Sequence, residues 1–242
     1  MQAIKTFELV KRYPNLTAVD RLSLEIRQGE LFALLGVNGA GKTTAIKMLS
    51  CLTKPTQGDA LVGGNSITYH PDRVKELIGV SPQETAVAPN LSVKENLELI
   101  CGIHGFSRKK AGEKIRELTE QFTLDSVLHR KAGKLSGGWQ RRVSIAMALI
   151  SEPKILFLDE PTLGLDVIAR HDLWDVIRSL KGSVTIVLTT HYMEEADVLS
   201  DRIGIMKSGR LLATGTAEEL KQIAGSASFE TAFVSIVKED TV

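Results

Sequence analysis

A short apolar run followed by a glycine-rich octapeptide constrains this chain more than any other feature of its sequence. Residues 31–35 read Leu-Phe-Ala-Leu-Leu, and Gly36-Val37-Asn38-Gly39-Ala40-Gly41-Lys42-Thr43 follows directly. An uninterrupted apolar run of this length is typical of a strand that is buried on both faces. The pattern from Lys42 to Cys51 is helical. The segment is therefore predicted to be a strand, a loop and a helix.

The octapeptide fits the pattern Gly-x-x-x-x-Gly-Lys-[Ser/Thr] in full. Glycines let the backbone turn tightly and direct its N–H groups at phosphate oxygens, and the start of a helix adds partial positive charge. Lys42 can reach the β- and γ-phosphates of a nucleotide, and the Thr43 hydroxyl can bind Mg²⁺. The loop predicts a nucleoside triphosphate site that extends to Thr44, but the motif alone does not indicate which class of protein carries it.

A second apolar run ends in two carboxylates. Residues 155–158 read Ile-Leu-Phe-Leu, and Asp159-Glu160 follow. A carboxylate at the carboxyl end of a strand beside a phosphate-binding loop can hold Mg²⁺. The adjacent Glu160 would then be free to polarise an attacking water molecule.

Strands alternate with helices over most of the chain, which predicts an α/β fold with a mostly parallel sheet. The first residues differ, because the ranges 4–10 and 22–26 cluster β-forming residues and predict an N-terminal antiparallel part. Residues Ser92–Glu95 form a capping box that opens a helical, relatively polar stretch. The predicted division is an α/β core of residues 1–91 and 155–215, an inserted helical subdomain of residues 92–154, and a short helical tail of residues 216–242.

Composition and charge argue against a chain that crosses a membrane itself and against one that binds nucleic acid through its overall charge. No apolar stretch approaches the roughly 20 residues that a membrane-spanning helix needs, and the N-terminus lacks the pattern of a signal peptide. The formal net charge of +1 provides no overall field for nucleic acid. We therefore expect a soluble, cytoplasmic chain without a nucleic-acid partner. Any role at a membrane would need a partner that spans it.

Several further motifs together resemble the ABC-type ATPases. Leu135-Ser136-Gly137-Gly138-Trp139-Gln140-Arg141-Arg142 is similar to the family's signature sequence, Leu163–Asp166 resembles its D-loop, and His191 resembles its switch histidine. Gln83 stands where the family has its Q-loop, and Tyr13 where it has an aromatic ring against adenine. The motifs occur in the family's order and cover nearly the whole chain. Trp139 is a departure, because the family more often has glutamine there, and we expect altered packing at this edge.

The resemblance implies a P-loop NTPase core that hydrolyses ATP with Mg²⁺. It also implies that two ATP-binding subunits, in a homodimer or a heterodimer, pair head to tail and drive a transmembrane permease. Ser136, Gly137 and Gly138 begin a predicted helix, an arrangement that binds anions. In this family such an end serves the ATP of the second subunit. The phosphate-binding loop of one chain would then form half of an ATP site, and Ser136–Gly138 of the second subunit would form the other half.

Three sets of residues follow from the motifs and the resemblance. The catalytic set is Lys42, Gln83, Glu160 and His191; the set for Mg²⁺ is Thr43, Gln83 and Asp159; the set for ATP is Tyr13, Gly36, Val37, Asn38, Gly39, Ala40, Gly41, Lys42, Thr43, Thr44, Ser136, Gly137, Gly138 and Asp166. Gln83 is expected to sense the γ-phosphate and the metal, and to couple closure to a partner. His191 is expected to hold the γ-phosphate or the water.

The direction of transport is suggested by resemblance alone. The run from His191 to Asp197 and the short tail around Phe229–Phe233 resemble the exporter branch that serves drugs, antibiotics or lipid-linked cargo. The chain would then sit on the inner face of the cell membrane through its permease. An importer subunit, a non-transport ABC ATPase that acts on ribosomes or DNA, and a nucleotide switch without turnover remain alternatives.

Overall fold

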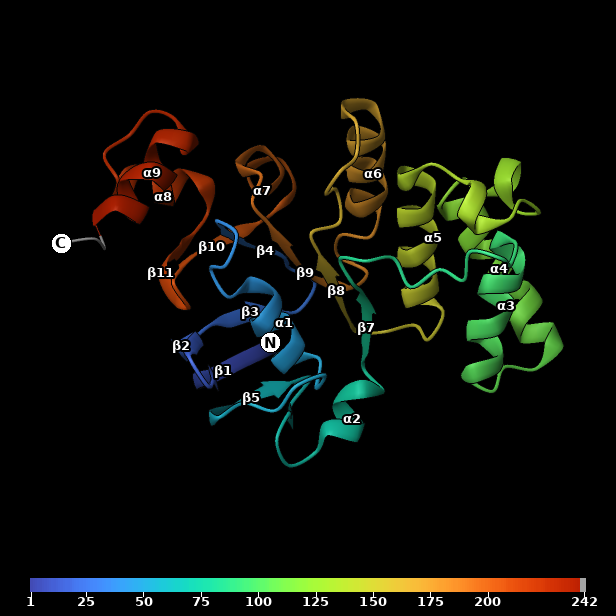
Figure 1. Cartoon of the computed structure of the whole chain (residues 1–242), viewed down its shortest axis with the longest axis horizontal. Coiled ribbons are helices and arrows are strands. Elements are labelled where there is room, and N and C mark those ends of the chain that lie inside the picture. Colours follow the sequence, from blue (N-terminus) through green and yellow to red (C-terminus); the bar gives the residue numbers. More distant parts are fainter. Residues whose placement is uncertain (240–242) are drawn as a thin grey trace.

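The computed structural model describes residues 1–239 and has a parallel sheet at its centre (Figure 1). Within this range the sheet has six strands in the order β11-β10-β4-β9-β8-β7. Neighbouring strands from β10 to β7 run parallel, and only β11 is antiparallel. The strands are β4 (Leu31–Gly36), β7 (Ile78–Ser81), β8 (Ile155–Asp159), β9 (Thr185–Thr190), β10 (Arg202–Lys207) and β11 (Arg210–Gly215).

A second, antiparallel sheet is formed by the N-terminal part of the described chain. It contains five strands, in which β2-β1-β5-β6 lie in order and β3 also pairs with β1. The strands are β1 (Gln2–Tyr13), β2 (Leu16–Leu22), β3 (Glu25–Arg27), β5 (Gln57–Val62) and β6 (Asn65–Ser66).

Strand β4 separates two hydrophobic cores. All six of its residues are buried, and successive side chains of a strand point to opposite faces of the sheet. Leu31, Ala33 and Leu35 accordingly join one core, while Phe32 and Leu34 join the other. The continuous apolar run of β4 is therefore explained by burial on both faces.

Helices cover both faces of the parallel sheet. Helix α1 (Lys42–Leu49) and the antiparallel sheet share one core, whereas α5 (Gly137–Leu149), α6 (Val167–Ser179) and α7 (Met193–Leu199) share the other. Helices α3 (Val93–Ile103) and α4 (Arg108–Gln121) lie on the far side of α5 (Figure 1). The remaining helices are α2 (Pro71–Lys75), α8 (Ala217–Ile223) and α9 (Phe229–Glu239), with 3₁₀ turns at Asp125–Val127 and Ala132–Lys134.

The predicted fold class is confirmed, and one strand differs from its prediction. Residues 22–26 were expected to form one strand, but β2 ends at Leu22 and β3 begins at Glu25. The break is stabilised by the buried Thr6 hydroxyl, which donates to Leu22 O at 2.8 Å and accepts from Leu24 N at 2.7 Å. A side chain on β1 thus replaces ladder bonds that a continuous strand would make.

The domain boundaries drawn from the sequence stay predictions. Residues 240–242 of the predicted tail lie outside the described part of the chain. No helix within residues 1–239 combines the length and the apolar character needed to cross a bilayer.

One buried amide joins the segment after β7 to helix α3. Asn96 is fully buried; its Oδ1 accepts from Ala88 N at 2.8 Å. Its Nδ2 donates to Ala88 O at 3.1 Å and to Ser92 O at 2.9 Å. The predicted capping box is present at the start of the same helix, where Ser92 and Glu95 bond reciprocally. The path of the chain from β7 into the helices is therefore defined by hydrogen bonds of one side chain.

Replacing Asn96 by Ala should lower the free energy of unfolding by about 3 kcal/mol, because it removes a fully buried amide and leaves Ala88 N without the acceptor that Asn96 Oδ1 provides. Urea unfolding followed by circular dichroism measures the change. Asn90→Ala is the matched control, since Asn90 is an exposed residue of the same segment. Equal stability of the two variants would contradict this account of Asn96.

Candidate active site

The phosphate-binding loop lies between β4 and α1 and needs glycine for steric reasons. A Cβ atom on Gly36 would lie 2.4 Å from Met206 O, and one on Gly41 would lie 2.3 Å from Ala18 O. Gly41 also has a φ of 101°, which disfavours any L side chain. The loop is anchored further by Gly209 N, which donates to Ala40 O at 2.9 Å. The pattern of glycines thus follows from close backbone contacts.

Helix α1 begins directly at this loop without a side-chain cap. The first N–H groups of a helix have no partners within it, so the N–H groups of the first turn remain available to an anion. This is the arrangement that the sequence predicted for Lys42, Thr43 and Thr44.

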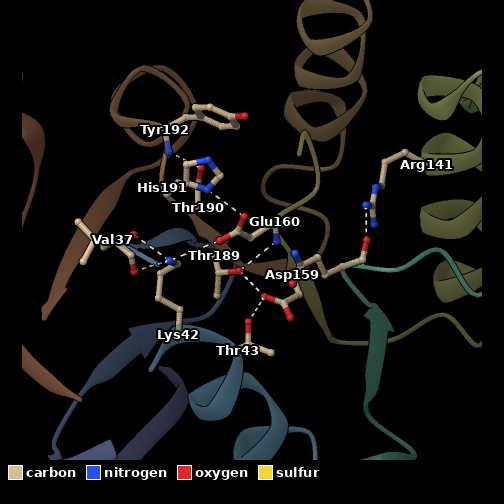
Figure 2. A network of polar contacts seen from close by, with 12 residues as sticks. Val37, Lys42, Thr43, Arg141, Asp159, Glu160, Thr189, Thr190, His191 and Tyr192 are labelled. Atoms are coloured by element: carbon tan, nitrogen blue, oxygen red, sulfur yellow. Dashed lines mark hydrogen bonds and ion pairs between the residues drawn. The ribbon is translucent and has the colours of Figure 1, made fainter. Parts of the chain in front are cut away.

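Lys42 is nearly buried and points back over the loop (Figure 2). Its Nζ donates to Gly36 O at 2.7 Å and to Val37 O at 3.2 Å. The same nitrogen lies 3.4 Å from Glu160 Oε1. Burial lowers the pKa of Lys42, while Glu160 and Asp159 counteract that effect. The ammonium group is therefore held in place by two carbonyls and a carboxylate.

Glu160 connects Lys42 to the predicted switch histidine. Its Oε2 lies 2.9 Å from His191 Nδ1, and the Glu160 side chain is 9% exposed. The backbone of Glu160 has a φ of 47°, in the left-handed region. Figure 2 shows Lys42, Glu160 and His191 in a row above the ends of the central strands. The structure therefore brings three of the four predicted catalytic side chains into contact.

Asp159 lies at the centre of a second set of contacts. Its Oδ1 accepts from Thr43 Oγ1 at 3.0 Å and from Thr189 Oγ1 at 2.6 Å. Oxygen ligands from one hydroxyl and one carboxylate fit Mg²⁺, which uses few protein ligands alongside phosphate oxygens and water. Within residues 1–239, no group of three or more His, Cys, Asp or Glu side chains could hold a metal. Thr43 and Asp159 therefore suit a metal that shares its ligands with a nucleotide.

A cleft of about 350 Å³ opens beside this cluster. Residues 38–44 of the loop form much of its wall, and the other lining residues are Leu16, Ala18, Gln83, Glu160 and Leu163. Gln83 is exposed, so its side chain is available to a ligand in the cleft. The cleft therefore brings together the phosphate-binding loop, two predicted metal-binding residues (Thr43 and Gln83) and the predicted catalytic acid Glu160.

Several predicted site residues do not line this cleft. Tyr13 is 44% exposed, and the Lys11 ammonium lies 5.3 Å from the centre of its ring. Ser136 precedes α5 without using its hydroxyl as a cap, and Asp166 caps α6 by accepting from Ala169 N at 2.9 Å. A Cβ on Gly137 would lie 3.4 Å from Leu165 Cδ2, so the start of α5 packs beside the D-loop. These residues stay predictions.

Two residues of the site were missed in the sequence. The Thr189 hydroxyl bonds Asp159 and also accepts from Glu160 N at 3.0 Å, so it orients both acids. Arg141 donates to Pro82 O and to Gln83 O, each at 2.6 Å, and so holds the backbone beside the cleft. Thr189 could have been found as a buried threonine at the end of a strand that precedes His191. Arg141 was quoted as part of the signature, but no role was predicted for it.

The cleft, the loop and the parallel sheet define the class of this protein as a P-loop nucleoside triphosphatase. Comparisons with known proteins narrow the class. Residues 19–163 match the family described as ABC transporter. The chain is 42% identical over 226 residues to the "Daunorubicin/doxorubicin resistance ATP-binding protein DrrA" of Streptomyces peucetius, covering 93% of this chain and 68% of the relative.

Solved structures agree with this result. A "Structure of ATP binding subunit of ABC transporter" superposes with a TM-score of 0.85 at 27% identity, covering 97% of this chain and 99% of the other. A "Dimeric structure of a post-hydrolysis state of the ATP-binding cassette MJ0796 bound to ADP and Pi" has a TM-score of 0.78 at 27% identity, covering 88% and 98%. The chain belongs to the ABC transporter family, as an ATP-binding subunit with ATPase activity.

Replacing Thr189 by Val should lower kcat for ATP hydrolysis about tenfold with little change in ATP affinity, because both acids lose the hydroxyl that orients them. Phosphate release and nucleotide titration measure the two effects. Thr185→Val is the matched control at the opposite end of β9, where the hydroxyl accepts from Gly29 N at 3.0 Å. Equal kcat in the two variants would exclude an orienting role for Thr189.

Proposed function

We propose that the chain hydrolyses ATP with Mg²⁺ on the loop of residues 36–43 and thereby powers a separate permease that exports hydrophobic drugs or lipid-linked cargo. The observation that carries the ATPase part is the contact of Glu160 with both Lys42 and His191, at 3.4 and 2.9 Å. The names of the relatives support the export part, since DrrA is named for resistance to daunorubicin and doxorubicin.

The proposed mechanism assigns one task to each side chain. Lys42 and the N–H groups of the loop stabilise charge on the phosphates. Thr43 and Asp159 would hold Mg²⁺, with Gln83 as a further ligand, and the ion would neutralise charge on the transferred phosphoryl group. Glu160 accepts a proton from the attacking water. His191 orients Glu160 through their contact and holds the water or the γ-phosphate.

The proposed catalytic unit is a head-to-tail dimer. The first N–H groups of α5 and the Ser136 hydroxyl are not used by a side-chain cap. They therefore suit the phosphates of a second nucleotide, although they do not line the cleft of their own chain. The related cassette is titled a dimer with ADP and phosphate. Asp166 would lie at the contact between the two subunits, and Tyr13 would pack on adenine.

The proposed place of action is the inner face of the cell membrane. The chain would bind there through its permease, because none of the helices described within residues 1–239 could span a bilayer. Phosphate release by the purified chain should rise when membranes that hold the permease are added, and rise again with cargo. Stimulation by ribosomes or DNA instead would favour a non-transport ATPase.

Replacing Glu160 by Gln should leave ATP binding intact and reduce turnover about 10²–10⁴-fold, because the amide cannot accept the proton from water. Phosphate release gives turnover, and titration with a fluorescent ATP analogue gives affinity. Glu113→Gln is the control, since Glu113 is an exposed acid on α4. Near-parental turnover of the Glu160 variant would remove Glu160 from its proposed role.

A mixing experiment tests the shared site. Lys42→Ala and Ser136→Arg subunits should each be inactive alone, because every site in those dimers lacks one half. Their mixture should recover activity, since the mixed dimer keeps one site with an intact loop and an intact signature. Phosphate release measured across mixing ratios checks this. A mixture that stays inactive would contradict a site shared between subunits.

A further inference from the structure

A buried acid on helix α7 lies outside the residues to which any role has been assigned. Glu195 has no exposed surface and follows His191 by four residues. Its Oε1 accepts from Trp174 Nε1 at 3.1 Å, and Trp174 on α6 is itself 1% exposed. Burying a carboxyl group is costly, and an apolar side chain would fill the same space at lower cost. The contacts of Glu195 therefore need an explanation.

Two threonine hydroxyls face this carboxyl group from the two catalytic segments. Thr190 directly precedes His191, and Thr162 follows Glu160 by two residues. Burial raises the pKa of Glu195, whereas hydrogen bonding to Thr190, Thr162 and Trp174 and the charge of Arg170 counteract the rise. The Thr190 Oγ1 atom already accepts from Tyr192 N at 3.0 Å, so its own proton is free to be donated to the acid. Figure 2 shows Thr190 directly beside His191 and Tyr192.

The contact between Glu195 and Thr162 is incomplete in this structure. Thr162 is 1% exposed, yet neither Thr162 Oγ1 nor Glu195 Oε2 has a partner at full hydrogen-bonding geometry. Buried polar atoms rarely stay without a partner. A small movement of the segment that carries Thr162 would satisfy both atoms with a single bond. The two orphaned atoms thus indicate a contact that closes in another state of the molecule.

Thr162 belongs to the segment that leads from Glu160 to Asp166. Leu165 N donates to Thr162 O at 3.1 Å, and the Leu165 side chain packs beside Gly137 of the signature. A displacement at the signature or at Asp166 would therefore move Thr162. On the other side, Glu195 lies in the first turn of α7, which begins at Met193 directly after His191 and Tyr192.

We propose that Glu195 is a positioning residue for ATP hydrolysis, which joins the segment Pro161–Asp166 to the strand end that presents His191. The carboxyl group faces the Thr190 hydroxyl on one side and closes onto the Thr162 hydroxyl on the other, while Trp174 fixes its orientation. Binding of a second subunit at Asp166 would then change the position of His191 through the buried side chain of Glu195. This inference rests on the proposed roles of Glu160 and His191 and on the proposed dimer.

Three variants separate positioning from simple packing. Glu195→Leu should lower kcat about tenfold with an unchanged KM for ATP and an unchanged or higher melting temperature. Glu195→Gln should restore turnover to within about twofold of the parent, because the amide oxygen still accepts from Trp174 and the amide nitrogen donates to Thr162. Asp197→Asn, an exposed acid on the same helix, is the matched control. Parental kcat in the Leu variant, or a fall in kcat that follows a fall in melting temperature, would overturn the proposal.

A double-mutant cycle tests the link through Thr162, and its Thr162→Val arm is informative even if the Leu variant folds poorly. Thr162→Val removes only a hydroxyl group and should lower kcat severalfold by itself. Combined with Glu195→Leu, it should add nothing further, because both changes break the same link. Independent multiplication of the two effects, or parental kcat for Thr162→Val, would refute the link.

The Glu160→Gln variant, assayed in parallel, distinguishes a failure of the inference about Glu195 from a failure of the proposed mechanism. If that variant is inactive while the Glu195 and Thr162 variants turn over normally, only the inference about Glu195 fails. If the Glu160→Gln variant is itself active, the proposed mechanism fails.

Discussion

The candidate site depends on a short chain of hydrogen bonds across the ends of parallel strands. The Asp159 carboxylate accepts from Thr43 at the start of α1 and from Thr189 on β9. The sheet register makes these bonds possible, because Asp159 pairs with Thr189 and Leu35 pairs with Thr190. Carboxyl ends of adjacent parallel strands meet at one edge, which is where α/β proteins bind their ligands. The hydrogen bonds of Asp159 thus fix the start of α1 relative to the ends of β8 and β9.

A second constraint is the burial of opposite charges next to these hydrogen bonds. Lys42 and Glu160 both have less than a tenth of their surface exposed. Such groups are tolerated only when they are paired and hydrogen-bonded. Lys42 satisfies its protons with Gly36 O, Val37 O and Glu160. A phosphate group that enters the cleft can therefore replace existing partners of a cation whose position is already set.

The sequence was most informative where local patterns have a single physical explanation. The apolar run of β4, the glycines of the loop and the capping box at Ser92 each point to one structure, and all three were predicted. The break between β2 and β3 was not, because it depends on the Thr6 hydroxyl of a different strand. Thr189 and Arg141 were missed for the same reason: their partners, Asp159 and Gln83, lie 30 and 58 positions away in the chain.

The backbone conformation of Glu160 costs conformational free energy, which its side-chain contacts offset. Its φ of 47° is a conformation that costs an L residue about 1 kcal/mol and costs glycine almost nothing. Glycine at residue 160 would relieve this strain, but it would leave the buried Lys42 ammonium without its carboxylate partner. The acid persists in an unfavourable conformation because the backbone turn there directs its side chain between Lys42 and His191.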